Sequence, residues 1–145
     1  MAIIIAKEEH LKVWTDLAVQ LFPNDTYEAE WQLNAEILEL ENEMGFLYEQ
    51  EGKIVAYMHL AIRHDYVNGT ETSPVVFLEA IYVLPEYRKR NIGRELVTYA
   101  EDFARQKGVR QLASDCLLDN TASERFHKSC GFIEKERVIC FAKDV

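Results

Sequence analysis

Residues 78–94 read Leu-Glu-Ala-Ile-Tyr-Val-Leu-Pro-Glu-Tyr-Arg-Lys-Arg-Asn-Ile-Gly-Arg, and they join three kinds of local structure without a linker. The first six residues belong to a strand that we expect over Val75–Val83, and Pro85 follows its end. After the turn the period changes, because apolar residues recur at helical spacing until Gly108 ends the helix. This apolar stripe consists of Ile92, Leu96, Val97, Ala100, Phe103 and Ala104. The sequence therefore predicts a strand, a turn and a helix in direct succession.

The turn between this strand and this helix is strongly basic, although the chain as a whole is acidic. Four positive charges fall within seven residues, on Arg88, Lys89, Arg90 and Arg94. The first amides of a helix have no acceptor inside the helix, and together with the helix dipole they attract anions. A small residue such as Gly93 lets the backbone approach a phosphate closely. We therefore expect the turn to bind the pyrophosphate of a nucleotide-bearing cofactor, the alternative being a merely solvated basic helix start.

The remaining segments predict a single α/β domain with a mixed sheet, in the order β-α-α-β-β-β-α-β-α-β. We expect strands at residues 3–6, 46–49, 53–66, 75–83 and 109–116, with one or two more over 132–142. Helices are expected around residues 11–21, 26–41, 92–107 and 120–130, the last opened by a capping box at Thr121 and Glu124. The apolar residues of the second helix are spread widely around it, so the pattern does not indicate which face is buried.

Length and charge restrict the function further. A chain of 145 residues fits one compact domain spanning residues 1–145. Sixteen basic and 25 acidic side chains give a formal charge of −9, which repels nucleic acid and anionic lipid and attracts cations. We therefore expect a small polycationic substrate, with no nucleic acid and no membrane as partner, unless the acidity serves only solubility.

The amino-terminal residues and the cysteines indicate the compartment. The chain begins Met-Ala-Ile-Ile-Ile-Ala-Lys without the features of a secretion signal. It also lacks an apolar run of the roughly 18 residues that a membrane helix needs. Cys116, Cys130 and Cys140 are odd in number and lack the spacing of a metal site. We expect a cytoplasmic protein without bound metal, in which the three cysteines are small core residues.

The basic turn and its flanks resemble the acetyl-coenzyme A signature of the GNAT acetyltransferases. In that signature an Arg or Gln, a Gly, and a Gly or Ala occupy three marked positions, which here are Arg88, Asn91 and Gly93. Asn91 departs from the usual glycine, but asparagine tolerates a positive φ better than most residues, so we expect the turn to keep its backbone shape. The resemblance extends over the whole chain in element order. It is close over Tyr66–Phe141. Within the family, the segments Tyr66–Pro74, Phe77–Tyr87 and Ala113–Asn120 are similar to the aminoglycoside 6′-N-acetyltransferases that form compact dimers.

The resemblance implies a binding site for acetyl-coenzyme A. The pantetheine arm would pair with the backbone of Ile81, Tyr82 and Val83, and an N–H group there would also stabilise the oxyanion. Asn120 would contact the same arm. The pyrophosphate would meet the turn and the first helical amides, formed by Arg88, Lys89, Arg90, Asn91, Ile92, Gly93 and Arg94.

The resemblance also implies the wall of an acceptor pocket, formed by Phe22, Tyr66, Glu79, Asp115 and Glu136. The carboxylates would bind ammonium groups, and the aromatic rings would face sugar rings. Glu79 would act as the base, directly or through water, and Asp115 mainly as an anchor. Judged from the residues alone, Glu79 could equally point to solvent from an antiparallel strand. Asp115 could be an ordinary acid at a strand end, and Glu136 a surface charge.

His127 stands where many GNAT enzymes have the tyrosine that protonates the coenzyme A thiolate. An imidazole can donate a proton near neutral pH, so His127 is a candidate general acid. A single histidine on a helix can also be a structural residue.

Taken together, the residues and the resemblance predict an enzyme that moves an acetyl group from acetyl-coenzyme A to the 6′-amine of an aminoglycoside by direct attack. This reaction would confer antibiotic resistance. The segment Arg137–Ala142 is apolar enough to pair across a two-fold axis, so we expect a homodimer. Two alternatives remain open: a GNAT enzyme for another polyamine or a protein amine, and a non-catalytic acyl-coenzyme A-binding module.

Overall fold

The computed structural model describes residues 2–145 and contains a five-stranded sheet in the order β1-β2-β3-β4-β5. Its strands are β1 (Ile3–Ile5), β2 (Glu43–Gln50), β3 (Lys53–Arg63), β4 (Val75–Val83) and β5 (Leu112–Ala113). Its α-helices are α1 (Leu11–Leu21), α2 (Tyr27–Glu39), α3 (Ile92–Gln106) and α4 (Thr121–Ser129), and short 3-10 helices span Glu8–His10 and Pro85–Tyr87. The pairs from β1 to β4 are antiparallel, whereas β5 is parallel to β4. The expected mixed α/β fold is confirmed.

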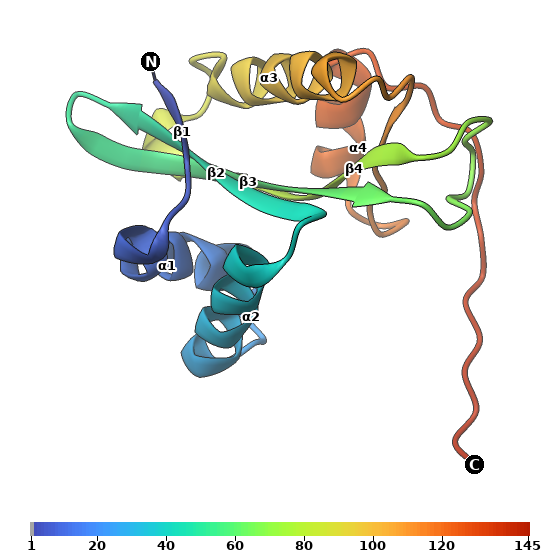
Figure 1. The fold of residues 1–145 in the computed structure, drawn as a ribbon, viewed down its shortest axis with the longest axis horizontal. Helices are drawn as coiled ribbons and strands as arrows, with labels where there is room; N and C mark the ends of the chain where they lie inside the picture. The colour runs from blue at the N-terminus through green and yellow to red at the C-terminus, as the bar shows by residue number, and fades with distance from the viewer. Residues whose placement is uncertain (1) are drawn as a thin grey trace.

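The sheet is the middle of three layers, with α1 and α2 on one face and α3 across the other (Figure 1). Trp14 of α1 and Leu96 of α3 are completely buried in these two interfaces. On the α3 side, the ring of Phe46 lies 5.0 Å from that of Tyr99 and 5.8 Å from that of Phe103, both in edge-to-face geometry. The core therefore has an apolar layer on each face of the sheet.

The helices α1 and α3 form where the apolar spacing predicts them, and their apolar stripes face the sheet. The buried residues of these stripes are Leu11, Trp14, Leu17 and Ala18 in α1, and Ile92, Leu96, Val97, Ala100 and Ala104 in α3. In α2 the buried residues are Glu30, Asn34 and Ile37, while Trp31 and Leu33 are exposed. Two of the three buried residues of α2 are therefore polar, which is why hydrophobic periodicity did not identify the inward face of this helix.

A β-bulge interrupts the pairing of β3 with β4. Leu78 pairs with Leu60 and Ala80 pairs with His59, so Glu79 is an extra residue on β4. A bulge bends its strand and re-aims the side chain of the inserted residue. The simple alternation of an antiparallel strand therefore does not apply to Glu79.

On its other edge, β4 is paired over only a short length. Val76 pairs with Leu112 and Phe77 pairs with Ala113, and the register ends there. Within residues 2–145, no strand lies beside β4 beyond this point on the β5 side. The backbone beyond Leu78 therefore forms an open strand edge inside the fold.

The strand expected over residues 132–142 is absent from the described chain. This segment instead passes the β3–β4 loop at Lys135 and Glu136 and then runs away from the body of the molecule to the carboxyl terminus (Figure 1). A strand needs a neighbour to satisfy its backbone hydrogen bonds, and within the described chain this segment has none. For the same reason β5 is limited to Leu112–Ala113 instead of the expected residues 109–116.

Two further expectations about the carboxy-terminal third are wrong. The N-cap of α4 is Asn120 rather than Thr121, because the Asn120 side chain accepts a hydrogen bond from the Ser123 amide at 3.1 Å. The cysteines are not core residues, since Cys116 and Cys140 are exposed and Cys130 is half-buried. They lie beyond β5, where the chain packs only partly against the sheet.

None of the helices in residues 2–145 is both long and apolar enough to cross a lipid bilayer.

Candidate active site

A cavity of about 560 Å³ lies between α2, the end of α1 and the strands β2 to β4. Its volume is typical of small-molecule sites. Carboxylates dominate its charged lining: Glu30, Glu43, Asp65 and Glu79 face one guanidinium group, that of Arg63. A cavity of this size and charge suits a small molecule with several ammonium groups.

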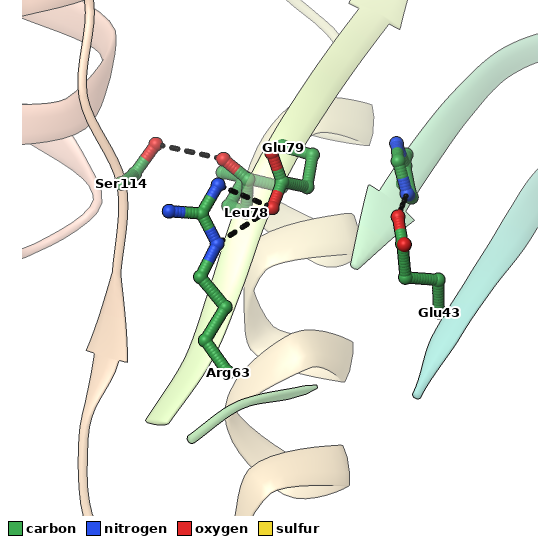
Figure 2. Close-up of polar contacts among 6 residues, drawn as sticks. Glu43, Arg63, Leu78, Glu79 and Ser114 are labelled. Atoms are coloured by element: carbon green, nitrogen blue, oxygen red, sulfur yellow. Dashed lines mark hydrogen bonds and ion pairs between the residues drawn. The ribbon is translucent and has the colours of Figure 1, made fainter. Parts of the chain in front are cut away.

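Glu79 lies at this cavity and is fixed by Arg63 (Figure 2). The Nε and Nη2 atoms of Arg63 both donate to the same oxygen of Glu79, Oε2, at 2.9 and 2.6 Å. The guanidinium carbon of Arg63 in turn lies 3.7 Å from the centre of the Phe77 ring. Glu79 is 22% exposed, so its carboxylate is half-buried and held in one orientation. The prediction that Glu79 faces a pocket and not bulk solvent agrees with this geometry.

The inward face of β3 contributes a second polar pair. Alternate residues of a strand share one face, and Tyr57, His59 and Arg63 accordingly line the same cavity. His59 is 9% exposed, and its Nε2 atom lies 2.8 Å from Oε1 of Glu43 on β2. This hydrogen bond links β2 to β3 beside the bulge.

Glu30 is the most deeply buried acid of the cavity, with 3% of its surface exposed. Burial and a hydrogen bond with the neighbouring Asp25 carboxyl raise the pKa of Glu30 to about 7. Burial, and secondarily the charge of Glu30, also raise the pKa of Tyr57. Glu30 and Tyr57 are therefore close enough to interact across the cavity.

The residues predicted for the acceptor pocket are only partly brought together. Phe22 lines the cavity with Glu79. Tyr66, Asp115 and Glu136 lie outside it and are exposed. Glu136 nevertheless lies next to the β3–β4 loop that contains Tyr66, because a Cβ atom at Gly69 of this loop would be 4.0 Å from its Oε2 atom.

The basic turn before α3 has the backbone shape expected for anion binding. Lys89 and Asn91 both adopt left-handed conformations, with φ of 62° and 66°, and Asn91 is the N-cap of α3. Left-handed residues in such turns direct successive N–H groups toward a common point, which forms an anion-binding concavity. The expectation that Asn91 adopts the positive φ of the family glycine is confirmed.

Gly93 allows α3 and α4 to pack closely. A Cβ atom at this position would lie only 2.7 Å from Cε1 of Phe126. The same interface is closed by Arg94, whose Nη2 atom donates to the carbonyl oxygen of Ser129 at 2.8 Å. Gly93 thus has a packing role in addition to the close backbone approach inferred from the sequence.

The other charged residues of the turn differ in their contacts. Arg88 donates from Nε to the carbonyl oxygen of Val83 at 2.9 Å and thereby ties the turn to the end of β4. Lys89 and Arg90 are exposed, and Ile92 is buried beneath the helix start. Lys89 and Arg90 are therefore the residues of this turn best placed to meet phosphate oxygens.

The open edge of β4 lies between the cavity and the turn. Ser114, just after β5, donates from Oγ to the carbonyl oxygen of Leu78 at 3.1 Å, at the point where the two strands separate (Figure 2). Beyond it follow Ile81, Tyr82 and Val83, all half-buried. An extended ligand that contains amides can pair with such an edge as an added strand does. This agrees with the predicted position of the pantetheine arm.

His127 on α4 is connected to this edge through Ser114. Its Nε2 atom lies 2.8 Å from the Ser114 Oγ atom, and its Nδ1 atom lies 2.7 Å from the carbonyl oxygen of Ser123. The Ser123 hydroxyl lies 3.3 Å from the same Nδ1 atom, so this nitrogen can either donate to the carbonyl or accept from the hydroxyl. His127 is therefore held at both ring nitrogens and linked through Ser114 to the open edge of β4.

Asn120, predicted to contact the pantetheine arm, uses its side-chain oxygen as the N-cap of α4. The amide NH2 group of the same side chain is left to donate to a ligand. Among residues 2–145, no group of three or more His, Cys, Asp or Glu side chains is arranged to hold a metal ion.

Sequence reasoning missed several residues of the cavity. His59 and Arg63 could have been found, since they interrupt an apolar strand at positions that share one face. Glu43 pairs with His59 only through the strand register, which the sequence does not show. Glu30 gave no signal, because it lies among the scattered apolar residues of α2.

The strand β4 thus leads from the acidic cavity at Glu79 to the anion-binding turn after Val83. A nucleotide thioester bound along this edge would present its acyl group to an amine in the cavity, which is the arrangement of an acyl-coenzyme A-dependent N-acyltransferase. The chain belongs to the acetyltransferase (GNAT) family, whose family model matches residues 7–132.

Curated relatives of nearly the same length match this chain along most of its sequence. An aminoglycoside N(6′)-acetyltransferase type 1 of Salmonella enteritidis is 40% identical over 134 residues, which are 92% of this chain and 92% of the relative. A protein of the same name from Acinetobacter genomosp. 13 is 40% identical over 146 residues, covering 100% of this chain and 99% of the relative.

Solved structures agree with these relatives. The apo aminoglycoside 6′-N-acetyltransferase AAC(6′)-IG of Acinetobacter haemolyticus superimposes with a TM-score of 0.96 at 39% identity, covering 100% of this chain and 99% of that one. AAC(6′)-Iy in complex with the bisubstrate analogue CoA-S-monomethyl-acetylneamine gives a TM-score of 0.93 at 38% identity, covering 99% and 97%.

Proposed function

We propose that this protein transfers the acetyl group of acetyl-coenzyme A to the 6′-amine of aminoglycoside antibiotics and so confers resistance to them. The observation that carries the proposal is the cavity beside Glu79, where carboxylates outnumber the single guanidinium group. Each ammonium group of a polyamine sugar gains charge-assisted hydrogen bonds in such a site. The names of the relatives and the neamine-based analogue bound by AAC(6′)-Iy support the same acceptor.

In this reaction the amine nitrogen attacks the thioester carbonyl carbon, a C–N bond forms, and the C–S bond breaks. The amine must lose a proton, and Glu79 accepts it, directly or through one water. Arg63 supports this role because it donates only to Oε2 and leaves Oε1 of Glu79 free to take the proton. The backbone near Ile81 and Val83 supplies the N–H group for the oxyanion.

In our proposal the Ser114 hydroxyl gives its proton to the leaving thiolate and takes one from Nε2 of His127, which lies 2.8 Å from it. Ser114 positions this imidazole, since it bonds both to His127 and to the Leu78 carbonyl at the open edge of β4. Replacement of His127 by Gln should then slow acetyl transfer by roughly a hundredfold or more, the range typical of a general acid. Ser114→Ala should slow acetyl transfer by a similar factor, while acetyl-coenzyme A should raise the melting temperature of this variant as much as that of the wild type. Equal rates in the wild type and both variants would remove His127 from the mechanism.

For the cofactor, the proposed contacts are the backbone of residues 81–83, the turn of residues 88–94 and Asn120. Two observations support them: the open edge of β4 and the left-handed residues Lys89 and Asn91. Phe22 would contact the acceptor inside the cavity. Tyr66, Asp115 and Glu136 stay predictions, as contacts to the outer parts of the acceptor.

The direct experiment measures thiol release from acetyl-coenzyme A with kanamycin, tobramycin or gentamicin as acceptor. We expect turnover with at least one of them, and loss of turnover in Glu79→Gln with unchanged thermal stabilisation by acetyl-coenzyme A. Turnover with spermidine or peptide amino termini alone would assign the enzyme to another amine. Stabilisation by the cofactor without turnover on any amine would favour a non-catalytic binding module.

We also propose that the protein is a homodimer. Val138, Ile139 and Phe141 are 58%, 81% and 90% exposed in a segment that has no strand partner in the described chain. A second copy related by a two-fold axis would bury these side chains and pair the backbone. Size-exclusion chromatography should therefore give about twice the monomer mass of 16.9 kDa. Elution as a monomer would refute the dimer.

The compartment in which we propose that the protein acts is the cytoplasm. The three cysteines are unpaired, and two of them are exposed, which suits a reducing environment. Fractionation of the producing cell would test this placement.

A further inference from the structure

We infer that Glu30 binds a second ammonium group of the acceptor in the depth of the cavity, while the reacting amine lies at Glu79. This inference rests on the proposed function, because it needs an acceptor with at least two amino groups. The family resemblance places no contact at Glu30, which belongs to α2 and lies outside the set Phe22, Tyr66, Glu79, Asp115 and Glu136.

The position of Glu30 is that of a ligand contact. Its side chain is directed into the cavity even though only 3% of the residue is exposed. Glu30 and Glu79 line the same space of about 560 Å³, so one molecule can reach both. Asn34, one turn further along α2, also lines this space and is held by a hydrogen bond to Thr15. The wall around Glu30 is therefore fixed before a ligand binds.

Glu30 lacks a cationic partner within residues 2–145. The other inner carboxylate, Glu43, is bonded to His59, and Glu79 is bonded to Arg63. The polar neighbour of Glu30 is instead another acid, Asp25. Removing a carboxylate from water without a cation or several donors is unfavourable. An ammonium group is the ligand that would satisfy both carboxyl groups at once.

The titratable and charged groups that face this part of the cavity come from three directions. Asp25 approaches from the turn before α2, and Tyr57 faces Glu30 from β3. His59 of β3, and His64 and Asp65 after its end, line the same cavity. Glu43 approaches from β2, and Arg63 and Glu79 lie further along the same cavity. The charged residue nearest to Glu30 is thus negative, and the raised pKa of about 7 agrees with this environment.

Binding would exchange a proton for the ammonium group. Below neutral pH the Glu30 carboxyl holds a proton, in part because Asp25 is its neighbour. When the ammonium group arrives, this proton leaves to solvent and the resulting carboxylate accepts N–H groups of the ligand. Acceptor binding should therefore release a proton below pH 7 and release none from Glu30 at higher pH.

The test is isothermal titration calorimetry with the full chain saturated with coenzyme A, using kanamycin and spermidine as probes. Wild type is compared with Glu30→Gln, which keeps the shape of the side chain but cannot become charged. Glu28→Gln is the matched control, because Glu28 lies on the exposed side of the same helical turn. Each titration is made at pH 6.0 and pH 8.5, in two buffers of different ionisation enthalpy, to count released protons.

We expect Glu30→Gln to weaken probe binding at pH 8.5 by about tenfold or more, the loss of a charge-assisted hydrogen bond. At pH 6.0 the wild type should release more protons per bound probe than Glu30→Gln, by a difference approaching one. The amino groups of the probe contribute equally in both proteins, so the difference belongs to Glu30. Glu28→Gln should match the wild type, and the coenzyme A affinity of all three should agree.

Equal probe affinity and equal proton release in the wild type and Glu30→Gln would overturn the inference. If the wild type binds spermidine but not kanamycin, the aminoglycoside assignment fails and the spermidine data alone decide the role of Glu30. If the wild type binds neither probe, both the proposed function and the inferred role of Glu30 are overturned.

Discussion

Arg63 donates two hydrogen bonds to one oxygen of Glu79, Oε2, and none to the other. The fork of the guanidinium group therefore fixes the carboxylate without covering it. Arg63 therefore positions the Glu79 carboxylate and does not block it, because an acceptor can still reach Oε1. The rigid placement is reinforced by the Phe77 ring beneath Arg63.

Replacement of Arg63 by Met should lower kcat for aminoglycoside acetylation by about tenfold. Without Arg63 the Glu79 carboxylate is mobile and is less often oriented toward the acceptor amine. The KM for the cationic acceptor should not rise, because Arg63 itself repels it. Arg63→Lys keeps the charge but not the two-donor fork, and should recover only part of the rate. Steady-state kinetics of the three proteins checks this. A rise in acceptor KM with unchanged kcat would show that Arg63 binds substrate instead.

Asn91 holds a left-handed conformation at the start of α3. Asn91→Gly should preserve stability and the KM for acetyl-coenzyme A, because glycine adopts this conformation without strain. Asn91→Ala should lose roughly 1 kcal/mol of unfolding free energy and raise the cofactor KM. Urea unfolding and cofactor titration of both variants measure the two effects. Equal behaviour of the alanine and glycine variants would mean that the turn does not need a positive φ.

Gly93 should tolerate no larger side chain while Phe126 is present. Gly93→Ala places a methyl group 2.7 Å from the Phe126 ring and should cost about 1–3 kcal/mol of unfolding free energy. The double variant Gly93→Ala with Phe126→Leu should be less destabilised than the sum of the two single variants, because the smaller side chain makes room. If the losses of unfolding free energy in the two single variants simply add in the double variant, the contact with Phe126 is not the reason that position 93 needs glycine.

Helices and strands were predictable where the spacing of apolar residues matches the face that is buried in the structure. The stripe from Ile92 to Ala104 specified α3 because it is both helical in spacing and buried, and Val75–Val83 was found with its bounds. The segment 132–142 was assigned as strand from its apolar residues, yet the described chain provides no neighbour for it. Strand formation depends on a partner, which a single segment does not reveal.

The site was predictable only in part, for the same reason. Lys89 and Asn91 act through local backbone geometry, so the turn could be identified from nearby residues. The bulge at Glu79 and the pair of Glu43 with His59 arise from the register between strands. Glu30 faces inward on a helix whose apolar residues partly face outward, so helix periodicity points away from it.

The burial of Glu30 has a consequence for stability that runs opposite to that of most carboxylates. Its folded-state pKa of about 7 lies above its ordinary value of 4.5. Between these two pH values the unfolded chain releases the proton while the folded protein keeps it. The unfolded state then binds fewer protons, so this group makes the free energy of unfolding fall as pH rises through that window. Below pH 4.5 both states are protonated, and the contribution vanishes.

Glu30→Gln should therefore be more stable than the wild type above pH 7, by about 1–3 kcal/mol, and equal to it near pH 4. Urea unfolding of both proteins at pH 4, 5.5, 7 and 8.5 gives the difference, and the exposed Glu28→Gln is the control that should show no such trend. A gap independent of pH would mean that Glu30 is not the titrating group. A variant that gains stability and loses acceptor affinity would identify Glu30 as a residue kept for binding at a cost to folding, because a purely structural residue would not improve stability when its charge is removed.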